Sequence, residues 1–411
     1  MKAPTGAKRV LIVSPCATHP ANAGSRRRML GLALTLRELG YVPELLYTDL
    51  MEGDVAAMRR WWGADFHFHP YRPKSLAWKA KRWLRRIAPE GSARRRWLQR
   101  ARIGSSPMRP GGTPVVRHPD EYYDGSLDPV IDRLVGKSRY QAVILEYILM
   151  SRAALRCPAP IQTLLDTHEV FALGDAGATA PLEKNWIHVD AAGELEALAR
   201  VNHPIAIQDN DAATLRRAGL KGVITFGHPV EIVEAASSAA ALQSDQVLFV
   251  SGGHPYDVEG LKWFAEEVFP LVRDWLGPDR ICVAGGIRDT MNPRPPFRFL
   301  GRVADLKALY AGARVVIAPL RQGTGLKIKV IEALGMGKAM VATDFAVRGM
   351  PASGAPAWLE SDSAAAFAAN LRTLMTDDGA LRRVMTEARA YAVNWNQKQK
   401  EALAAALQPT G

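Results

Sequence analysis

Short apolar runs alternate with helical patterns from the start of the chain. Residues 8–14, KRVLIVS, form an apolar, β-branched run that is typical of a buried parallel strand. After a loop, apolar side chains recur every three or four positions from Met29 to Leu39, and Gly40 follows. This spacing predicts an amphipathic helix that packs on a sheet and ends at the glycine. A second strand is expected at residues 42–48.

The same alternation continues in two cycles. A polar, alanine-rich stretch at residues 234–243 separates them, and we interpret it as part of a linker. Two consecutive α/β cycles predict two doubly wound, Rossmann-like domains, each a mostly parallel sheet covered by helices. Further strands are predicted at residues 141–146, 161–166, 204–208, 222–226, 246–250, 280–284, 314–319 and 339–343. The expected division is an N-terminal domain at 1–233, a linker at 234–245, a C-terminal domain at 246–385, and a final helix at 386–411 that could return to the first domain.

The composition narrows the class of protein. Of 411 residues, 48% are hydrophobic and 23% are charged, which excludes disordered, collagen-like and disulfide-scaffold classes. The three cysteines, Cys16, Cys157 and Cys282, are too widely spaced for a zinc motif or a disulfide framework and favour a reducing compartment. The first apolar run is too short for a signal-peptide core or a membrane span. We therefore expect a cytoplasmic protein.

The positive charge is concentrated in one segment. The net charge is +12, yet residues 72–102 hold twelve Lys and Arg against Glu90 alone, so the other residues are nearly neutral. A basic segment with tryptophans favours docking on an anionic membrane surface, on the cytoplasmic side. A solvated, packed arm is the structural alternative, and nucleic acid is the partner that we least expect. The residues expected at this surface are Trp78, Arg82, Trp83, Arg94, Arg95, Arg96 and Trp97.

A candidate phosphate site lies in residues 319–343, PLRQGTGLKIKVIEALGMGKAMVAT. A glycine-containing loop follows a predicted strand and precedes a helix expected to start near Leu326, whose free N–H groups and dipole favour an anion. Lys329 would neutralise a diphosphate, and Glu332 would accept hydrogen bonds from ribose hydroxyls. The alternative is an ordinary strand-to-helix turn with solvated lysines. The residues expected at the donor are Gly323, Thr324, Gly325, Leu326 and Lys327.

These residues resemble a known family. The stretch GTGLKIKVIEALGMGKAMVAT resembles the donor-binding motif of family-four retaining glycosyltransferases, also called glycosyl transferases group 1, which have the GT-B fold. Residues 297–319 look like that family's F-x-G-x-v-x-D-l-x-x-l-Y motif and the strand after it, and residues 250–273 resemble its first C-domain strand, loop and helix. In the N-terminal half, residues 15–48, LLDTHEV and IAIQDNDAATLRRAG also resemble family segments. Residues 51–138 and the last stretch are weakly matched.

The resemblance implies a specific activity. It implies transfer of a sugar from a nucleotide-diphosphate donor, with retention of configuration, to a glycan or lipid-linked acceptor in bacterial envelope or exopolysaccharide biosynthesis. The donor would be bound mainly by the C-terminal domain and the acceptor by the N-terminal domain, in a central cleft. No metal or other cofactor is expected, because lysines and N–H groups would stabilise the leaving diphosphate. Thr324 stands where the family has its first motif glutamate, which leaves the identity of the donor sugar open.

Several residues at predicted strand ends are further candidates. The resemblance implies that His168, directly after an apolar strand, contacts the donor sugar; a buried structural histidine is the alternative. Gly24 at a helix start would let backbone approach a ligand. Gly252 and Gly253 would face the phosphates, Gly285 and Gly286 would form a floor near the base, and Arg302 with Val303 would line the base slot. A plain structural turn remains the alternative for each glycine.

Other interpretations of the sequence remain open. His67 and His69 lie in a HFHP stretch with no third ligand nearby, so we expect an exposed strand and no metal site. A sugar-nucleotide 2-epimerase on the same fold would consume the donor without an acceptor. A catalytically silent scaffold would use the basic segment to bind membrane or nucleic acid, and Thr324 in place of glutamate keeps this alternative open.

Overall fold

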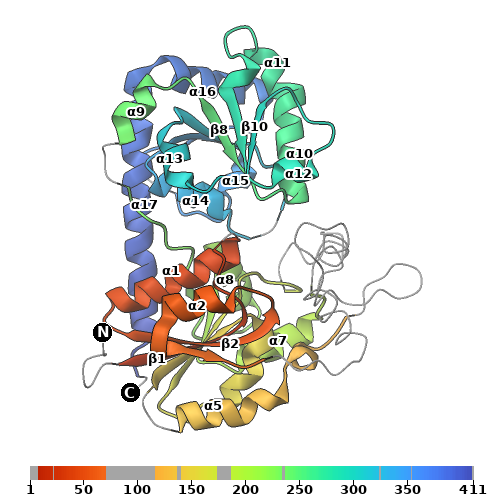
Figure 1. Ribbon diagram of the computed structural model, residues 1–411, viewed down its shortest axis with the longest axis vertical. Helices are drawn as coiled ribbons and strands as arrows, with labels where there is room; N and C mark the ends of the chain where they lie inside the picture. Colours follow the sequence, from red (N-terminus) through yellow and green to blue (C-terminus); the bar gives the residue numbers. More distant parts are fainter. Residues whose placement is uncertain are drawn as a thin grey trace. The chain divides into compact units, whose positions relative to one another are not determined.

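The computed structural model describes residues 8–21, 23–70, 116–136, 140–173, 187–233, 237–323, 325–352 and 354–409. The chain forms two compact units (Figure 1). The first unit comprises Met1–Gly227 together with Lys400–Gly411, and the second comprises His228–Gln399. The basic segment 72–102, with all its candidate membrane residues, lies outside the described residues.

The first unit is built on a seven-stranded parallel sheet of order β3-β2-β1-β4-β5-β6-β7. Strand order reverses between β1 and β4, where Ile12 of β1 pairs with Leu45 of β2 on one side and with Ile144 of β4 on the other. Such a reversal opens a crevice at the carboxyl ends of the strands, where ligands bind in doubly wound folds. The strands are β1 Arg9–Cys16, β2 Val42–Met51, β3 Phe66–Phe68, β4 Tyr140–Glu146, β5 Gln162–Asp166, β6 His203–Ala206 and β7 Ile224–Thr225.

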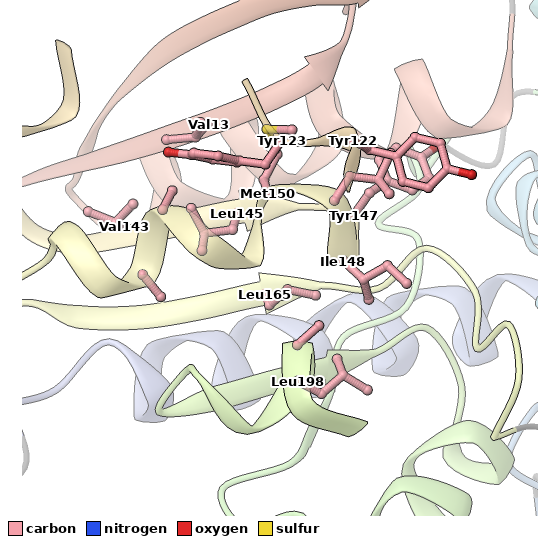
Figure 2. Close-up of a cluster of buried hydrophobic side chains, with 14 of the residues drawn as sticks. Val13, Tyr122, Tyr123, Val143, Leu145, Tyr147, Ile148, Met150, Leu165 and Leu198 are labelled. Carbon is pink, nitrogen blue, oxygen red and sulfur yellow. The ribbon is translucent and has the colours of Figure 1, made fainter. Parts of the chain in front are cut away.

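Both faces of this sheet are buried, because alternate strand residues enter two different hydrophobic clusters. Val143 and Leu145 of β4 face one cluster, which Figure 2 shows. Ile144 faces the other cluster, which includes Leu403 from the last helix. The helices of this unit are α1 Gly24–Glu38, α2 Val55–Trp62, η1 Gly63–Asp65, η2 Pro119–Tyr122, η3 Gly125–Leu127, α5 Asp128–Val135, η4 Ile148–Arg156, α7 Ala191–Ala199 and α8 Asp209–Arg217.

The second unit repeats the plan with a six-stranded parallel sheet of order β10-β9-β8-β11-β12-β13. Here the order reverses between β8 and β11. The strands are β8 Val247–Val250, β9 Ile281–Ala284, β10 Arg298–Gly301, β11 Val315–Ala318, β12 Ala339–Ala342 and β13 Leu359–Glu360. The helices are α9 Ser237–Gln243, α10 Pro255–Trp263, η6 Phe264–Val268, α11 Phe269–Val272, η7 Pro278–Arg280, α12 Ile287–Thr290, α13 Leu306–Ala311, α14 Ile328–Gly335, α15 Asp344–Val347, α16 Ala364–Thr376 and α17 Asp378–Ala406.

The prediction of two doubly wound parallel sheets is confirmed, and the differences are local. Part of the stretch interpreted as a linker is the helix α9, because its alanines favour a helix wherever the backbone can form one. The final helix was expected from residue 386 but begins at Asp378. His67 and His69 are half-buried, not exposed, and bond Glu44 and Ser126. Among the described helices, none combines the length and apolar character that a bilayer span needs.

Candidate functional site

The loop after β11 presents the start of α14 as an anion site. Lys327 is the N-cap residue, no side chain caps the helix, and its first turn holds no acidic residue. The N–H groups of Ile328 and Val330 donate to the carbonyls of Leu326 and Lys327, at 3.1 and 2.8 Å. The positive end of the helix dipole is what faces the loop with no protein anion on the helix itself. Gly325 has a φ of +62°, and a side chain there would meet nothing within 4 Å. Its backbone is thus open to a ligand.

Lys329 joins this loop to the loop after β8. Its Nζ forms an ion pair with Asp257 of α10, with side chains 21% and 9% exposed respectively. The other Asp257 oxygen accepts a hydrogen bond from the Ser251 hydroxyl at 2.6 Å, and that hydroxyl accepts one from the Gly253 N–H at 3.0 Å. Because β8 and β11 flank the reversal of strand order, this network lies at the ligand-binding edge of the second sheet.

The other residues that we expected to contact the sugar-nucleotide donor differ in their contacts and in their burial. The Lys327 amine turns back and donates to the carbonyl of Gly325 at 2.7 Å. Glu332 lies with Oε1 3.6 Å from Nε2 of His228, so its carboxylate already faces a histidine within the same unit. Leu326 is buried. Thr324 lies outside the described residues.

Two glycine loops pack against each other at the ends of β8 and β9. A Cβ on Gly285 would lie 2.0 Å from the carbonyl oxygen of Ser251, and one on Gly253 would lie 3.0 Å from that of Gly286. Close backbone approach therefore accounts for these glycines, as the structural alternative proposed. Gly252 differs, because a Cβ there would enter open space.

Arg302 and Gly323 lie beside these loops. The Arg302 side chain is exposed, with Nη2 3.8 Å from the place of a Cβ on Gly286, and Val303 is half-buried. Gly323 has a φ of +132°, and its missing side chain makes room for the ring of Tyr256, which would be 2.9 Å from a Cβ. Tyr256 thus packs on the loop between β11 and α14.

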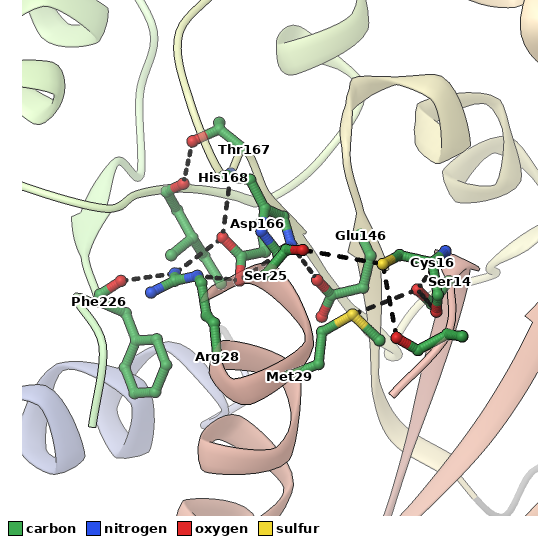
Figure 3. Close-up of polar contacts among 12 residues, drawn as sticks. Ser14, Cys16, Ser25, Arg28, Met29, Glu146, Asp166, Thr167, His168 and Phe226 are labelled. Carbon is green, nitrogen blue, oxygen red and sulfur yellow. Dashed lines mark hydrogen bonds and ion pairs between the residues drawn. The ribbon is translucent and has the colours of Figure 1, made fainter. Parts of the chain in front are cut away.

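A second polar cluster forms at the carboxyl ends of β4 and β5 in the first unit (Figure 3). Nε2 of His168 lies 2.5 Å from Oε2 of Glu146, the last residue of β4. The His168 ring also stacks on Tyr147, with centroids 4.0 Å apart and planes 6° from parallel. Both stacked residues have positive φ, 59° for His168 and 65° for Tyr147. Such strain in non-glycine residues is concentrated at functional sites.

Arg28 of α1 bonds the Asp166 carboxylate of this cluster. Its Nε and Nη2 each donate to a different oxygen of Asp166 at 2.8 Å, and neither side chain is exposed. Arg28 also donates to the carbonyls of Phe226 and Gly227. Gly24, expected near a ligand, is the first residue of the same helix.

The two buried carboxyls are shifted in opposite directions. Burial raises the pKa of Glu146, the Asp166 carboxylate adds to this rise, and His168 only partly opposes it. Burial would also raise the pKa of Asp166, but Arg28 and His168 outweigh it and hold that pKa below its usual value. Neighbouring carboxyls with separated pKa values are typical of sites that manage protons.

Glu146, Asp166 and His168 also offer three metal-ligand atoms within 4.8 Å of one another. However, the Arg28 guanidinium already bonds both oxygens of Asp166 and places a positive charge beside them. This donor set is therefore poorly suited to a cation, and we assign no metal to it.

Sequence reasoning missed Glu146, Asp166, Arg28 and Asp257. The strands QAVILE and QTLLD each end in an acidic residue, and this signal was available. Glu146 is the register partner of Asp166 across β4 and β5, so the topology alone brings them together.

A protein-family model matches part of the second unit, and solved structures match the fold of nearly the whole chain. Residues 244–377 match the family model described as Glycosyl transferases group 1. None of the curated proteins compared with the chain matches it significantly.

Solved structures resemble the chain over nearly its whole length. TarM from S. aureus is 10% identical with a TM-score of 0.63, and covers 99% of this chain and 100% of its own. HepE from Anabaena is 13% identical with a TM-score of 0.57 (96% and 99%). Sucrose-phosphate synthase from Thermosynechococcus elongatus is 14% identical with a TM-score of 0.59 (97% and 100%). The chain thus has the two-domain GT-B fold, and residues 244–377 of its second unit match the glycosyl transferases group 1 model.

Proposed function

We propose that the chain transfers a sugar from a nucleoside diphosphate sugar to a glycan or lipid-linked acceptor. The observation that carries this is Lys329 at the open start of α14, beside Gly325, within the matched domain. Two structural neighbours support the ligand class. HepE was solved with UDP and glucose, and TarM was solved with UDP and α-GlcNAc-glycerol.

The diphosphate would occupy the start of α14. Negative charge grows on it as the glycosidic bond breaks, and Lys329 with the positive end of the helix dipole would stabilise this charge. Lys329 forms an ion pair with Asp257 in the structure, so the diphosphate would have to replace Asp257 as the partner of Lys329. Glu332 would then bond ribose hydroxyls, and Arg302 with Val303 would border the base.

The finer features of the proposal follow the family resemblance. We propose retention of configuration, transfer without a divalent metal, and participation of His168 through a sugar contact. The metal is dispensable in this scheme because the lysine and backbone donors supply the positive charge. A role in envelope or exopolysaccharide assembly, at the inner face of the cytoplasmic membrane, would use the basic segment 72–102.

A thermal-shift panel with UDP, GDP, ADP, TDP and CMP tests the donor site. A nucleotide at a hundred times its dissociation constant stabilises the folded protein by about 2.7 kcal/mol, which raises Tm by several degrees. We expect one base to stabilise the wild type and, at the same concentration, to stabilise Lys329→Ala by about half as much or less. The matched control is Lys307→Ala, which removes a lysine that is 59% exposed in the same unit.

The outcome decides between activities. If no nucleotide shifts the wild type, the donor-site assignment is wrong. If one does, product analysis with its sugar conjugates separates transfer to an acceptor from epimerisation of the donor alone.

A further inference from the structure

The His168 ring is held on its edge and on its face by two consecutive residues. Glu146 bonds the edge through Oε2 at 2.5 Å, and Tyr147 covers the face at 4.0 Å. The Glu146 side chain has no exposure, and its other oxygen, Oε1, has no hydrogen-bond partner in the described part of the chain. Its bonding is thus directed at His168 alone.

A second buried glutamate that bonds a histidine, Glu44, provides a comparison for the Glu146–His168 pair. Glu44 on β2 bonds Nε2 of His67 at 2.7 Å, the hydroxyl of Tyr140 at 2.6 Å, and Arg9. Both of its oxygens are used, and it lies near the amino ends of the strands, since its register partner is Leu11 of β1. Leaving a buried oxygen without a partner, as at Glu146, costs stability and is uncommon where only folding is served.

Charge balance determines which hydrogens the pair carries. Asp166 is neutralised by Arg28 through two hydrogen bonds. In a site without exposed carboxyl atoms, the remaining Glu146–His168 pair is then most stable with no net charge. Two arrangements satisfy this: a protonated Glu146 that donates to a neutral imidazole, or a Glu146 carboxylate that accepts from an imidazolium.

Both neutral arrangements have the same consequence for the other ring nitrogen. When a protonated Glu146 donates to Nε2, the neutral ring carries its hydrogen on Nδ1. When the ring is an imidazolium, both nitrogens carry hydrogens. Nδ1 therefore bears a hydrogen in either case, and Nε2 is occupied.

We propose that Glu146 is a positioning residue that occupies Nε2 of His168 and makes Nδ1–H the donor that meets a sugar oxygen. This rests on the proposed function, in which His168 contacts the donor sugar. The structure supports it through the contact at Nε2, the stack on Tyr147 and the positive φ of both ring residues. An N–H at this position can donate to a hydroxyl oxygen or to the ring oxygen of a sugar, but it cannot accept a hydrogen bond from a sugar hydroxyl.

Several charged or titratable groups lie around the pair. They are Cys16 of β1, Arg28 of α1, Tyr147 after β4, Asp166 at the end of β5, and Glu169 beyond it. Of these, Asp166 and Arg28 compensate each other.

Nitrogen-15 spectroscopy of the full-length chain tests the proposal without any activity. In protein labelled on its nine histidines, His168 is identified by its loss in His168→Gln. We expect Nδ1 to carry a hydrogen at neutral pH in the wild type. A bare Nδ1 would overturn the proposal, whether or not the chain is a transferase.

Variants of Glu146 test its effect on the reaction. Glu146→Leu removes the partner of Nε2 and should lower kcat about 10- to 100-fold, the loss typical when a residue that orients a ligand-binding histidine is removed. Glu146→Gln keeps a donor for Nε2 and should restore most of kcat while changing its pH profile. Nucleotide affinity should stay constant, because the nucleotide binds to other residues.

The matched control is Glu44→Leu, which also removes a buried glutamate from a histidine Nε2. It should lower stability without changing kcat of the folded protein. Equal kcat in wild type and folded Glu146→Leu would overturn the positioning role. If Glu146→Leu does not fold, Glu146→Gln and the wild-type spectrum decide the matter. If nucleotides bind but no sugar is transferred, the proposed function fails, and the spectrum still tests the pair.

Discussion

In the proposed donor site, Asp257 would compete with the diphosphate for Lys329, so removing its charge should strengthen nucleotide binding. In Asp257→Asn the lysine loses its carboxylate partner, while the amide still accepts a hydrogen bond from the Ser251 hydroxyl. The two side chains are 21% and 9% exposed, so the pair lies between a surface and a buried ion pair. We assign it about 1 kcal/mol, the upper end of the surface range.

Removing this competitor should tighten nucleoside diphosphate binding about fivefold, since 1.4 kcal/mol corresponds to a tenfold change in Kd. Lys329→Ala should weaken binding about 10- to 100-fold, because a charged hydrogen bond contributes about 1.5–3 kcal/mol. Isothermal titration at constant ionic strength measures both, together with the double variant, which should behave like Lys329→Ala. If Asp257→Asn weakens binding as much as Lys329→Ala does, Asp257 positions the lysine and the competition model is wrong.

Three further changes test other parts of the structure. Arg28→Leu should cost about 3–5 kcal/mol of unfolding free energy, because it leaves a buried carboxylate unpaired. Arg156→Leu breaks a pair whose side chains are both 42% exposed and should leave the urea midpoint almost unchanged, so equal midpoints for the two variants would contradict this. Gly253→Ala places a Cβ 2.7 Å from a threonine hydroxyl at a φ of +88°, and should lower the unfolding free energy by about 1–3 kcal/mol. Gly252→Ala places its Cβ in open space, and thermal unfolding should show a stability within about 0.5 kcal/mol of wild type. Burial raises the pKa of Glu169 from 4.5 to about 6, so the folded state binds a proton more tightly than the unfolded state does. The unfolding free energy therefore falls as pH rises through this window. Urea denaturation at about pH 5 and about pH 7 should show a smaller fall in unfolding free energy for Glu169→Gln than for the wild type.

The sequence was sufficient for elements whose signal is local. Apolar runs separated by helical periodicity predicted the central strands of both sheets, because strands buried on two faces need continuous hydrophobic residues. The strands β10 and β13 were not predicted, because they lie at the edges of the second sheet and their residues are partly exposed. The helix expected near Leu326 begins at Ile328, so the placement of Lys329 in its first turn followed from spacing alone. The helix α9 within the segment 234–243 was not predicted, because the polar composition was weighed above the helix propensity of alanine.

Partners far apart in the chain were beyond sequence reasoning. Lys329 meets Asp257 across 72 positions, and Arg28 meets Asp166 across 138. No periodicity encodes such pairs, because they depend on which strands become neighbours. Glu146 and Asp166 are the intermediate case: both end apolar strands in the sequence, but only the pairing of β4 with β5 makes them adjacent. The expected membrane role of residues 72–102 stays a prediction.

The helix α17 gives the chain an unusual order of synthesis and folding. Its residues after 399 belong to the first unit, where Leu403 and Ala406 are buried in the same cluster as Leu32 and Leu36 of α1. The part of this cluster that Leu403 and Ala406 fill therefore stays open until the residues after 399 have been synthesised. The second unit is contiguous, from His228 to Gln399, and can complete its core earlier. The last core residues of the first unit are thus synthesised after the whole second unit, the reverse of the usual N-terminal-first order.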